Sequence, residues 1–354
     1  MSSIAVTLTH APREKPSPDN LGFGNYFTDH MFLMDYASAK GWHNARIVPY
    51  SPLPLDPASM VLHYGQEVFE GLKAYGAADG SLRLFRACDN IRRFNRSCER
   101  LGAPPIDEAL FMEAILLLLR TDADWSPHKP DASLYIRPFL IATDAFLGVR
   151  SSDSYLFVII LSPVGAYYAT GMSPTNILVE DEDVRAVRGG LGYAKTGANY
   201  AATIRSQERA KLKGFTQVLW LDALERRYIE EIGTSNAFFV INGTALTPPL
   251  GGSILPGITR DSCLRLLEYW GVPARETPLT IDEVISACES GRLEEAFASG
   301  TAAVISPVGS LTYKDTTVTI NNGEVGPLAW RLYDTLTAMQ RGAEDDIFGW
   351  VSKV

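Results

Sequence analysis

The chain has 354 residues, with 32 lysine and arginine side chains against 41 aspartate and glutamate side chains and a net charge of -9 at pH 7. This length favours two domains, each large enough to bury a substantial interior. The acidic balance argues against a nucleic-acid surface, because such a surface needs a basic stripe that displaces counterions.

The four cysteines, Cys88, Cys98, Cys263 and Cys288, form no CxxC pair and have no clustered histidines around them. We therefore expect neither a metal site nor a disulfide framework. The longest apolar runs, 155–161 and 115–119, are far shorter than the roughly 20 residues that span a bilayer, so we expect no membrane segment. The first residues lack the basic start and apolar core of a secretory signal, which makes the cytoplasm the expected compartment.

The first half of the chain predicts an arm followed by mixed helices and strands. Residues 1–22 are polar and contain prolines, as in an arm that lies on the rest of the protein. Alternating apolar residues on either side of Asp79 and Gly80 predict a hairpin. Asp89 is expected to cap a helix over 90–101. The other elements expected here are a helix over residues 107–120 and strands over residues 134–142 and 155–161.

The segment 163–174 is rich in Gly, Pro and Tyr and has no regular period, which favours an interdomain linker. We therefore predict an N-terminal domain over residues 1–162 and a C-terminal domain over residues 175–354. The elements expected after the linker are strands over residues 176–180, 217–221, 237–241, 296–299 and 304–306 and helices over residues 199–213, 259–270, 280–289 and 327–340.

The stretch RAVRGGLGYAKTGANY, residues 185–200, presents Lys195 among glycines. A dinucleotide fingerprint fails because it needs a glycine at the position of Lys195. A nucleotide-binding Walker loop needs a glycine before the lysine, and Ala194 stands there instead. The third interpretation is a lysine used as an amine, which forms a Schiff base when burial or nearby cations favour its uncharged form. Arg185 and Arg188 are close enough in sequence to supply those cations.

This stretch, followed by EEIGTSNAFF, LTPPLGGSILPGITRD and FASGTAAVISP, resembles the branched-chain amino acid aminotransferases of fold type IV of the pyridoxal phosphate enzymes. The resemblance runs from FTDHMF at residues 27–32 to SGTAA at residues 299–303. It implies a mixed α/β (α+β) fold, with a small N-terminal domain on the substrate side and a larger C-terminal domain that binds pyridoxal 5'-phosphate and has a β-barrel-like core. It also implies a homodimer with a shared active site. The implied reaction exchanges the amino group between L-leucine, L-isoleucine or L-valine and 2-oxoglutarate in a ping-pong cycle.

The resemblance assigns the cofactor residues. Lys195 matches the lysine that forms the Schiff base with the cofactor and moves the substrate proton. Glu231 matches the carboxylate that pairs with the pyridine nitrogen, while its neighbour Glu230 faces the other side of a strand. Tyr200 matches the tyrosine that reaches the ring oxygen. The phosphate is expected to be held by two arginines, a threonine and the N–H groups of a helix start, namely Arg93, Arg185, Thr301, Ile258 and Thr259.

On the substrate side, Tyr135 and Arg137 alternate along one strand and so face the same way. In the family the tyrosine and the N–H groups around Thr301 and Ala302 hold the α-carboxylate, and the arginine receives the distal carboxylate of glutamate. The remaining pocket positions match Phe23, Phe69 and Thr234, together with Tyr64 from the neighbouring subunit.

Two alternatives stay open. D-amino acid aminotransferases and aminodeoxychorismate lyases share the lysine and the glutamate, but not the combination of YIRPF with FTDHMF and LTPPL that this chain has. A rival from another class is a cofactor carrier without catalysis, or a nucleotide-binding module built on the stretch around Lys195.

Overall fold

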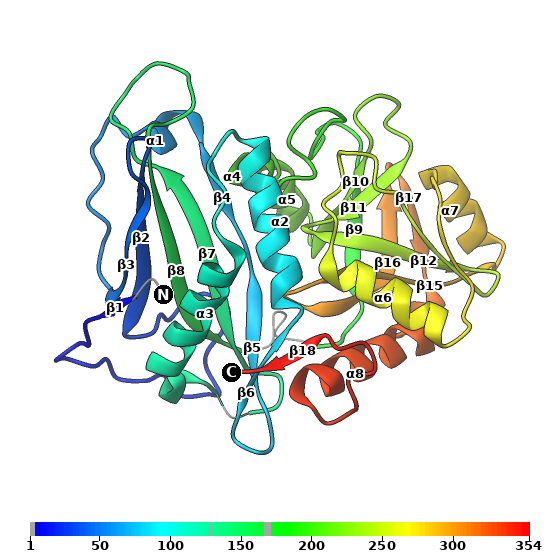
Figure 1. Ribbon diagram of the computed structural model, residues 1–354. Helices are drawn as coiled ribbons and strands as arrows, with labels where there is room; N and C mark the ends of the chain where they lie inside the picture. Colours follow the sequence, from blue (N-terminus) through cyan, green and yellow to red (C-terminus); the bar gives the residue numbers. More distant parts are fainter. Residues whose placement is uncertain (1–3, 128, 166–170) are drawn as a thin grey trace. The chain divides into compact units, whose positions relative to one another are not determined.

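The computed structural model describes residues 4–127, 129–165 and 171–354. These residues form two compact units, which Figure 1 shows with the chain coloured along its sequence. The first unit comprises the described residues up to 165, together with Ala194–Gly197 and Ala338–Val354. The second comprises residues 171–193 and Ala198–Thr337. No helix in the described part of the chain is both long enough and apolar enough to cross a bilayer.

The described residues of the first unit build one nine-stranded sheet. Its strand order is β1-β3-β2-β8-β7-β5-β6-β18, and β4 pairs with β7. The strands are β1 (Ala5–Val6), β2 (His30–Ala37), β3 (Gly41–Pro49), β4 (Glu67–Phe69), β5 (Leu72–Gly76), β6 (Leu82–Phe85), β7 (Ser133–Ala142), β8 (Ser154–Val164) and β18 (Val351–Lys353). The helices are α1 (Met60–Tyr64), α2 (Ala87–Arg100), α3 (Glu108–Thr121) and the 3-10 turn η1 (Ala123–Trp125).

Helices α2 and α3 pack against one face of this sheet (Figure 1), and three phenylalanines join the layers. Phe111 of α3 lies edge to face with Phe157 of β8 and with Phe94 of α2, at centroid distances of 4.7 Å and 5.2 Å. Helix α2 begins three residues earlier than predicted. Asp89 therefore lies inside its first turn instead of capping it, and there it accepts a hydrogen bond from Arg86 Nε at 2.7 Å.

The second unit is built on a closed ring of strands. Strands β11, β10, β9, β16, β15 and β12 pair in that order, and β12 pairs back to β11. The expected mixed fold with a barrel-like core is confirmed. The strands of this unit are β9 (Thr175–Glu180), β10 (Gln217–Leu221), β11 (Ile229–Ile232), β12 (Ser235–Ile241), β13 (Thr244–Thr247), β14 (Ala274–Glu276), β15 (Leu293–Gly300), β16 (Val304–Tyr313) and β17 (Thr316–Thr319).

The helices of the second half of the chain are α4 (Gly197–Ala201), α5 (Ile204–Leu212), α6 (Ile258–Tyr269), α7 (Ile281–Glu289), α8 (Pro327–Arg341) and the 3-10 turn η2 (Asn321–Gly323). The single helix predicted over 199–213 is in fact two helices. Between them the Thr203 hydroxyl donates to the Tyr200 carbonyl at 2.8 Å. Such a local side-chain bond competes with the regular helical pattern and explains the break.

The division into units differs from the predicted domains after residue 175. Ala194–Gly197 and Ala338–Val354 lie in the first unit, although the sequence placed them in a C-terminal domain over 175–354. Strand β18 is the clearest reason, because it pairs antiparallel with β6. The linker expected over 163–174 falls partly on residues 166–170, which lie outside the described residues.

Candidate active site

The residues expected at the active site are divided between the two units. In the first unit, the backbone around Lys195 is fixed on both sides. The Lys195 N–H donates to Ser97 Oγ at 2.9 Å, and the Lys195 carbonyl accepts from the Phe69 N–H at 3.0 Å. Two residues later, the Gly197 N–H donates to the Glu67 carboxylate. The Lys195 Nζ lies 4.7 Å from the centroid of the Phe69 ring. The amine is thus presented by an anchored backbone.

Glu67 is a residue that the sequence analysis did not single out. Burial raises the pKa of its carboxyl, and the Gly197 hydrogen bond and the charges of Arg137 and Lys195 oppose that rise in part. Glu67 therefore lies close enough to both cations to be influenced by them. A signal was available in the sequence, because Glu67 alternates with Phe69 along one strand and so shares its face.

Arg93 of α2 and Glu70 form a buried ion pair in the first unit. Arg93 donates from Nε to Glu70 Oε1 at 2.7 Å and from Nη2 to Oε2 at 3.0 Å. Glu70 is 0% exposed and Arg93 4% exposed. Burial alone would raise the pKa of Glu70, but the Arg93 charge and its hydrogen bonds, with smaller contributions from the Lys195 charge and from Asn90, outweigh it and lower the pKa. Glu70 thus orients the guanidinium of Arg93 through two hydrogen bonds.

The residues expected on the substrate side come together in the first unit. Arg137 Nη2 donates to Tyr135 Oη at 3.0 Å, and the Arg137 guanidinium lies 4.9 Å from the centroid of the Phe69 ring. The Phe23 ring meets the Tyr135 ring edge to face at 5.0 Å. A Cβ on Gly71 would lie 1.9 Å from Tyr135 Oη, so this glycine leaves the space for the hydroxyl.

Tyr64 lies apart from this group. It ends α1 in an exposed position, and its hydroxyl donates to the Leu147 carbonyl. Its expected place in the pocket of a neighbouring subunit stays a prediction.

In the second unit, Glu231 of β11 is only 3% exposed and forms an ion pair with Arg185, with 2.5 Å between Oε2 and Nε. Arg185 Nη2 also donates to the carbonyls of Gly192 at 3.1 Å and Ser253 at 3.0 Å. The family resemblance placed Arg185 near the phosphate, and that role stays a prediction; the pair with Glu231 was not foreseen. A buried carboxylate needs a partner of opposite charge, and Arg185 supplies it here.

The glycine-rich stretch supports this arrangement by close approach. A Cβ on Gly192 would lie 2.1 Å from the Ser253 carbonyl oxygen, so a larger residue would push the two backbones apart. Gly192 therefore allows Arg185 to reach both carbonyls at once.

Glu231 lies beside the start of helix α6. Its Oε1 accepts from the Leu255 N–H at 3.0 Å and from Asn236 Nδ2 at 3.2 Å. Gly257, two residues after Leu255, is the N-cap of α6, with extended dihedrals and no side chain to cap the helix. Ile258 and Thr259 then begin the helix. The first N–H groups of a helix attract anions, so a carboxylate and an anion-binding helix start lie side by side.

The other predicted residues of the second unit lie on short segments. Tyr200 is half-buried on α4, and Thr234 is exposed in the turn between β11 and β12. Thr301 and Ala302 lie in the turn between β15 and β16, and both are half-buried. Their roles stay predictions.

The chemistry of these residues fits pyridoxal 5'-phosphate. The group needs an amine for its aldehyde, a carboxylate for its ring nitrogen, and cations with backbone N–H groups for its phosphate. The structure provides the anchored Lys195 in one unit. In the other, Glu231 is held by the charge of Arg185 next to the uncapped start of α6.

Comparisons with known proteins agree with this chemistry. The model of the family "Amino-transferase class IV" matches residues 67–311. Branched-chain-amino-acid aminotransferase 2 of Bacillus subtilis is 55% identical over 352 residues, which cover 99% of this chain and 97% of that protein.

Solved structures show the same similarity. The branched-chain amino acid aminotransferase of Escherichia coli has a TM-score of 0.78 at 27% identity and covers 92% of this chain and 98% of its own. The T.th. enzyme, solved with N-(5'-phosphopyridoxyl)-L-glutamate, has a TM-score of 0.74 at 26% identity, covering 90% and 97%. The chain therefore belongs to the class IV aminotransferases and, within them, to the branched-chain amino acid aminotransferases.

Proposed function

We propose that this enzyme transfers the amino group between L-leucine, L-isoleucine or L-valine and 2-oxoglutarate, in a ping-pong cycle that uses pyridoxal 5'-phosphate. The observation that carries the proposal is Lys195, whose backbone is anchored on both sides and whose amine lies against Phe69. The T.th. structure contains a phosphopyridoxyl group joined to L-glutamate, which supports both the cofactor and the second substrate.

When bound, the cofactor supplies an aldehyde that accepts an amine and a ring that takes up electrons. In our proposal Lys195 would supply the amine for that aldehyde and would move the proton at the substrate α-carbon. Glu231 would pair with the ring nitrogen, and Tyr200 would serve the ring oxygen. The N–H groups of Ile258 and Thr259 would hold the phosphate.

Two further residues complete the phosphate site that we propose. Arg93 offers the charge of its guanidinium, which Glu70 orients, and Thr301 offers its hydroxyl. Glu70 acts here as a positioning residue, because its two hydrogen bonds fix the plane of the guanidinium.

Recognition of both an apolar and an acidic substrate is proposed to depend on Arg137. Its guanidinium lies against the Phe69 ring, while Phe23 packs on Tyr135 close by. An aliphatic side chain can lie on these rings and on the arginine stem, and a distal carboxylate can pair with the guanidinium. The α-carboxylate is assigned to Tyr135 and the N–H groups around Thr301 and Ala302, and the apolar pocket extends to Thr234.

We further propose a homodimer in the cytoplasm, in which Tyr64 completes the pocket of the neighbouring subunit. Its exposed position, at 37% of its surface, supports this assignment.

The experiment that tests the proposal is an amino-donor screen of the purified, cofactor-loaded enzyme with 2-oxoglutarate as acceptor. We expect transfer from L-leucine, L-isoleucine and L-valine and none from D-leucine. Transfer from D-amino acids alone would identify a D-amino acid aminotransferase. Pyruvate release from aminodeoxychorismate without amino transfer would identify a lyase.

A further inference from the structure

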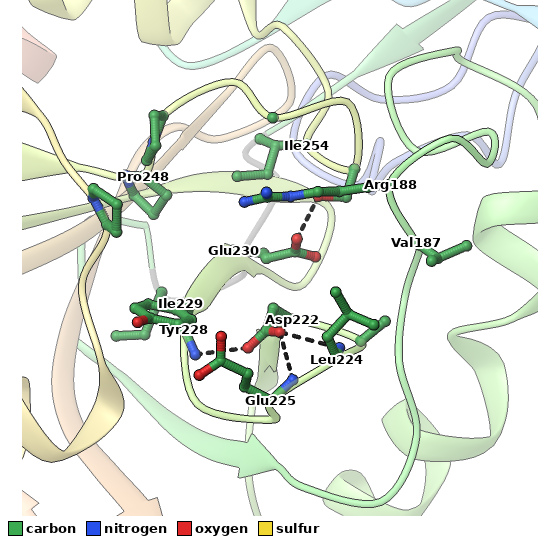
Figure 2. A pocket seen from close by; sticks show the side chains of 15 residues that line it. Val187, Arg188, Asp222, Leu224, Glu225, Tyr228, Ile229, Glu230, Pro248 and Ile254 are labelled. Atoms are coloured by element: carbon green, nitrogen blue, oxygen red, sulfur yellow. Dashed lines mark hydrogen bonds between the residues drawn. The ribbon is translucent and has the colours of Figure 1, made fainter.

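The second unit contains a cavity of about 400 Å³ that the proposed reaction does not use (Figure 2). Glu230 lines it, whereas its neighbour Glu231 is not one of the lining residues. Adjacent residues of a strand point to opposite sides. The cavity therefore lies on the other side of β11 from the carboxylate assigned to the cofactor.

Glu230, which lines this cavity, carries an unsatisfied polar atom. Its side chain is only 7% exposed, and Ser253 Oγ donates a hydrogen bond to Oε1. Oε2 is buried and has no hydrogen-bond partner among the described residues. Burial also raises the pKa of this carboxyl, which shows that the surroundings oppose its charge. A buried oxygen in this state is stabilised by a ligand that brings a hydrogen-bond donor.

Arg188 supplies the opposite charge on the same cavity. Its guanidinium packs over Gly251, with Nε 3.4 Å and Nη2 3.5 Å from where a Cβ on that glycine would lie. In the view of Figure 2 it extends across the cavity above Glu230. Arg188 is exposed and forms no ion pair with an acidic side chain in the described part of the chain.

Two other acidic residues line the cavity, Asp222 and the exposed Glu225, and Asp222 is already engaged. Asp222 accepts hydrogen bonds from the backbone N–H groups of Leu224, Glu225, Arg227 and Tyr228 at 2.8–3.0 Å. Figure 2 shows several of these bonds closing a turn below Glu230. Asp222 thus shapes the cavity floor, and the buried carboxylate that remains to bind a ligand is Glu230, with Arg188 as the cation.

Between these charges the walls are apolar, formed by Pro248, Pro249, Ile229 and Ile254 among others. The volume falls within the range of about 300–1,000 Å³ that is typical of small-molecule sites. We propose that this cavity binds a free amino acid with an apolar side chain, whose ammonium meets Glu230, whose carboxylate meets Arg188 and whose side chain packs on the prolines.

A ligand in this cavity is connected to the carboxylate that we assign to the cofactor. Ser253 donates to Glu230 with its side chain and accepts from Arg185 with its carbonyl. Arg185 in turn pairs with Glu231. A ligand that binds Glu230 changes the hydrogen bond between Glu230 and Ser253, and Ser253 holds the arginine that pairs with Glu231. The cavity is therefore a regulatory site of the same enzyme. The proposed binding of an amino acid in this cavity does not depend on which substrates the enzyme uses.

The test uses α-methylleucine, which has no hydrogen on its α-carbon and therefore cannot be transaminated. Binding to the cofactor-loaded enzyme is measured by equilibrium dialysis, and the number of equivalents per chain is compared between variants. We expect wild type to bind one equivalent more than Glu230→Gln or Arg188→Gln. Each variant loses a hydrogen bond to a charged group, so the affinity for that additional equivalent should fall about tenfold to hundredfold.

The matched control is Arg265→Gln, which removes an exposed arginine of α6 in the same unit and should keep the full number of equivalents. Two fragments test the charges separately. Isoamylamine lacks the carboxylate and 4-methylpentanoate lacks the ammonium, so both should compete for this equivalent more weakly than α-methylleucine. Melting temperatures verify that each variant is folded. If Glu230→Gln does not fold, Arg188→Gln alone suffices for the comparison.

Three results would overturn the proposal. The first is that Arg188→Gln binds as many equivalents as wild type, with the same affinity. The second is loss of an equivalent in the Arg265→Gln control as well. The third is isoamylamine competing as strongly as α-methylleucine, which would mean that a simple amine is the ligand and that Arg188 has no part in binding it.

Discussion

Replacing Glu70 with alanine would leave the Arg93 guanidinium buried without its carboxylate. Both side chains are almost completely buried, and two hydrogen bonds of 2.7 Å and 3.0 Å join them. Removing one partner of such a pair costs about 3–5 kcal/mol, because the remaining charge stays in a region of low dielectric. We expect a loss of this size in the free energy of unfolding of the first unit.

The control is Asp35→Ala, which breaks a carboxylate–arginine pair between β2 and β3 of the same unit. Asp35 lies 2.6 Å from Arg46 Nη1, but the two side chains are 33% and 25% exposed. Solvent screening limits such a pair to about 0–1 kcal/mol. Urea unfolding gives the overall loss, and hydrogen exchange of the α2 amides assigns it to the helix that carries Arg93. Equal losses in the two variants would refute the argument that burial sets the cost.

The same pair predicts a pH dependence. Because the pKa of Glu70 is lowered in the folded protein, the pair stabilises the fold above the unfolded pKa of about 4.3. This contribution is lost as the pH falls through the lower, folded pKa. The free energy of unfolding of Glu70→Ala should therefore depend less on acid pH than that of wild type. An equal pH dependence in the two proteins would contradict this.

The remaining predictions concern activity. Lys195→Ala should abolish turnover, since no other amine is assigned to the aldehyde, and near-normal amino transfer in this variant would rule out that role. Glu231→Gln should retain cofactor but lose on the order of 100-fold in rate, because an amide stabilises the ring charge less; an unchanged rate with normal cofactor absorbance would exclude it. Arg137→Met should slow the glutamate half-reaction more than the leucine half-reaction by roughly 30-fold to several thousand-fold. Single-turnover kinetics measure the rates of the two half-reactions separately. Equal losses of rate in the two would show that Arg137 binds the α-carboxylate instead.

Local patterns predicted the individual elements well. A helix over 90–101, as predicted, places Ile91, Phe94 and Cys98 on one face, and all three are at most 1% exposed. The alternation of Tyr135 and Arg137 predicted that they share a face, and the structure joins them by a hydrogen bond. Such patterns are set by the geometry of a single helix or strand, so they can be read from neighbouring residues.

Contacts between distant residues were not predictable in this way. The pair of Arg185 and Glu231 joins residues whose sequence spacing carries no pattern, and nothing local marks either as the partner of the other. Hydrogen bonds with Ser97, Phe69 and Glu67, all distant in sequence, join residues 194–197 to the first unit. Resemblance to a family identified the lysine, but only the structure shows what fixes its backbone.

The pairing of β18 with β6 has a consequence for synthesis on the ribosome. The sheet of the first unit receives one of its strands from Val351–Lys353, whereas the second unit is complete by Thr337. Domains generally fold in the order in which they emerge, but here the N-terminal sheet has an open edge at β6 until residue 353 has left the exit tunnel. An open strand edge is a site for pairing with other chains. The nascent chain therefore keeps this edge open throughout the synthesis of its C-terminal barrel, until β18 has docked.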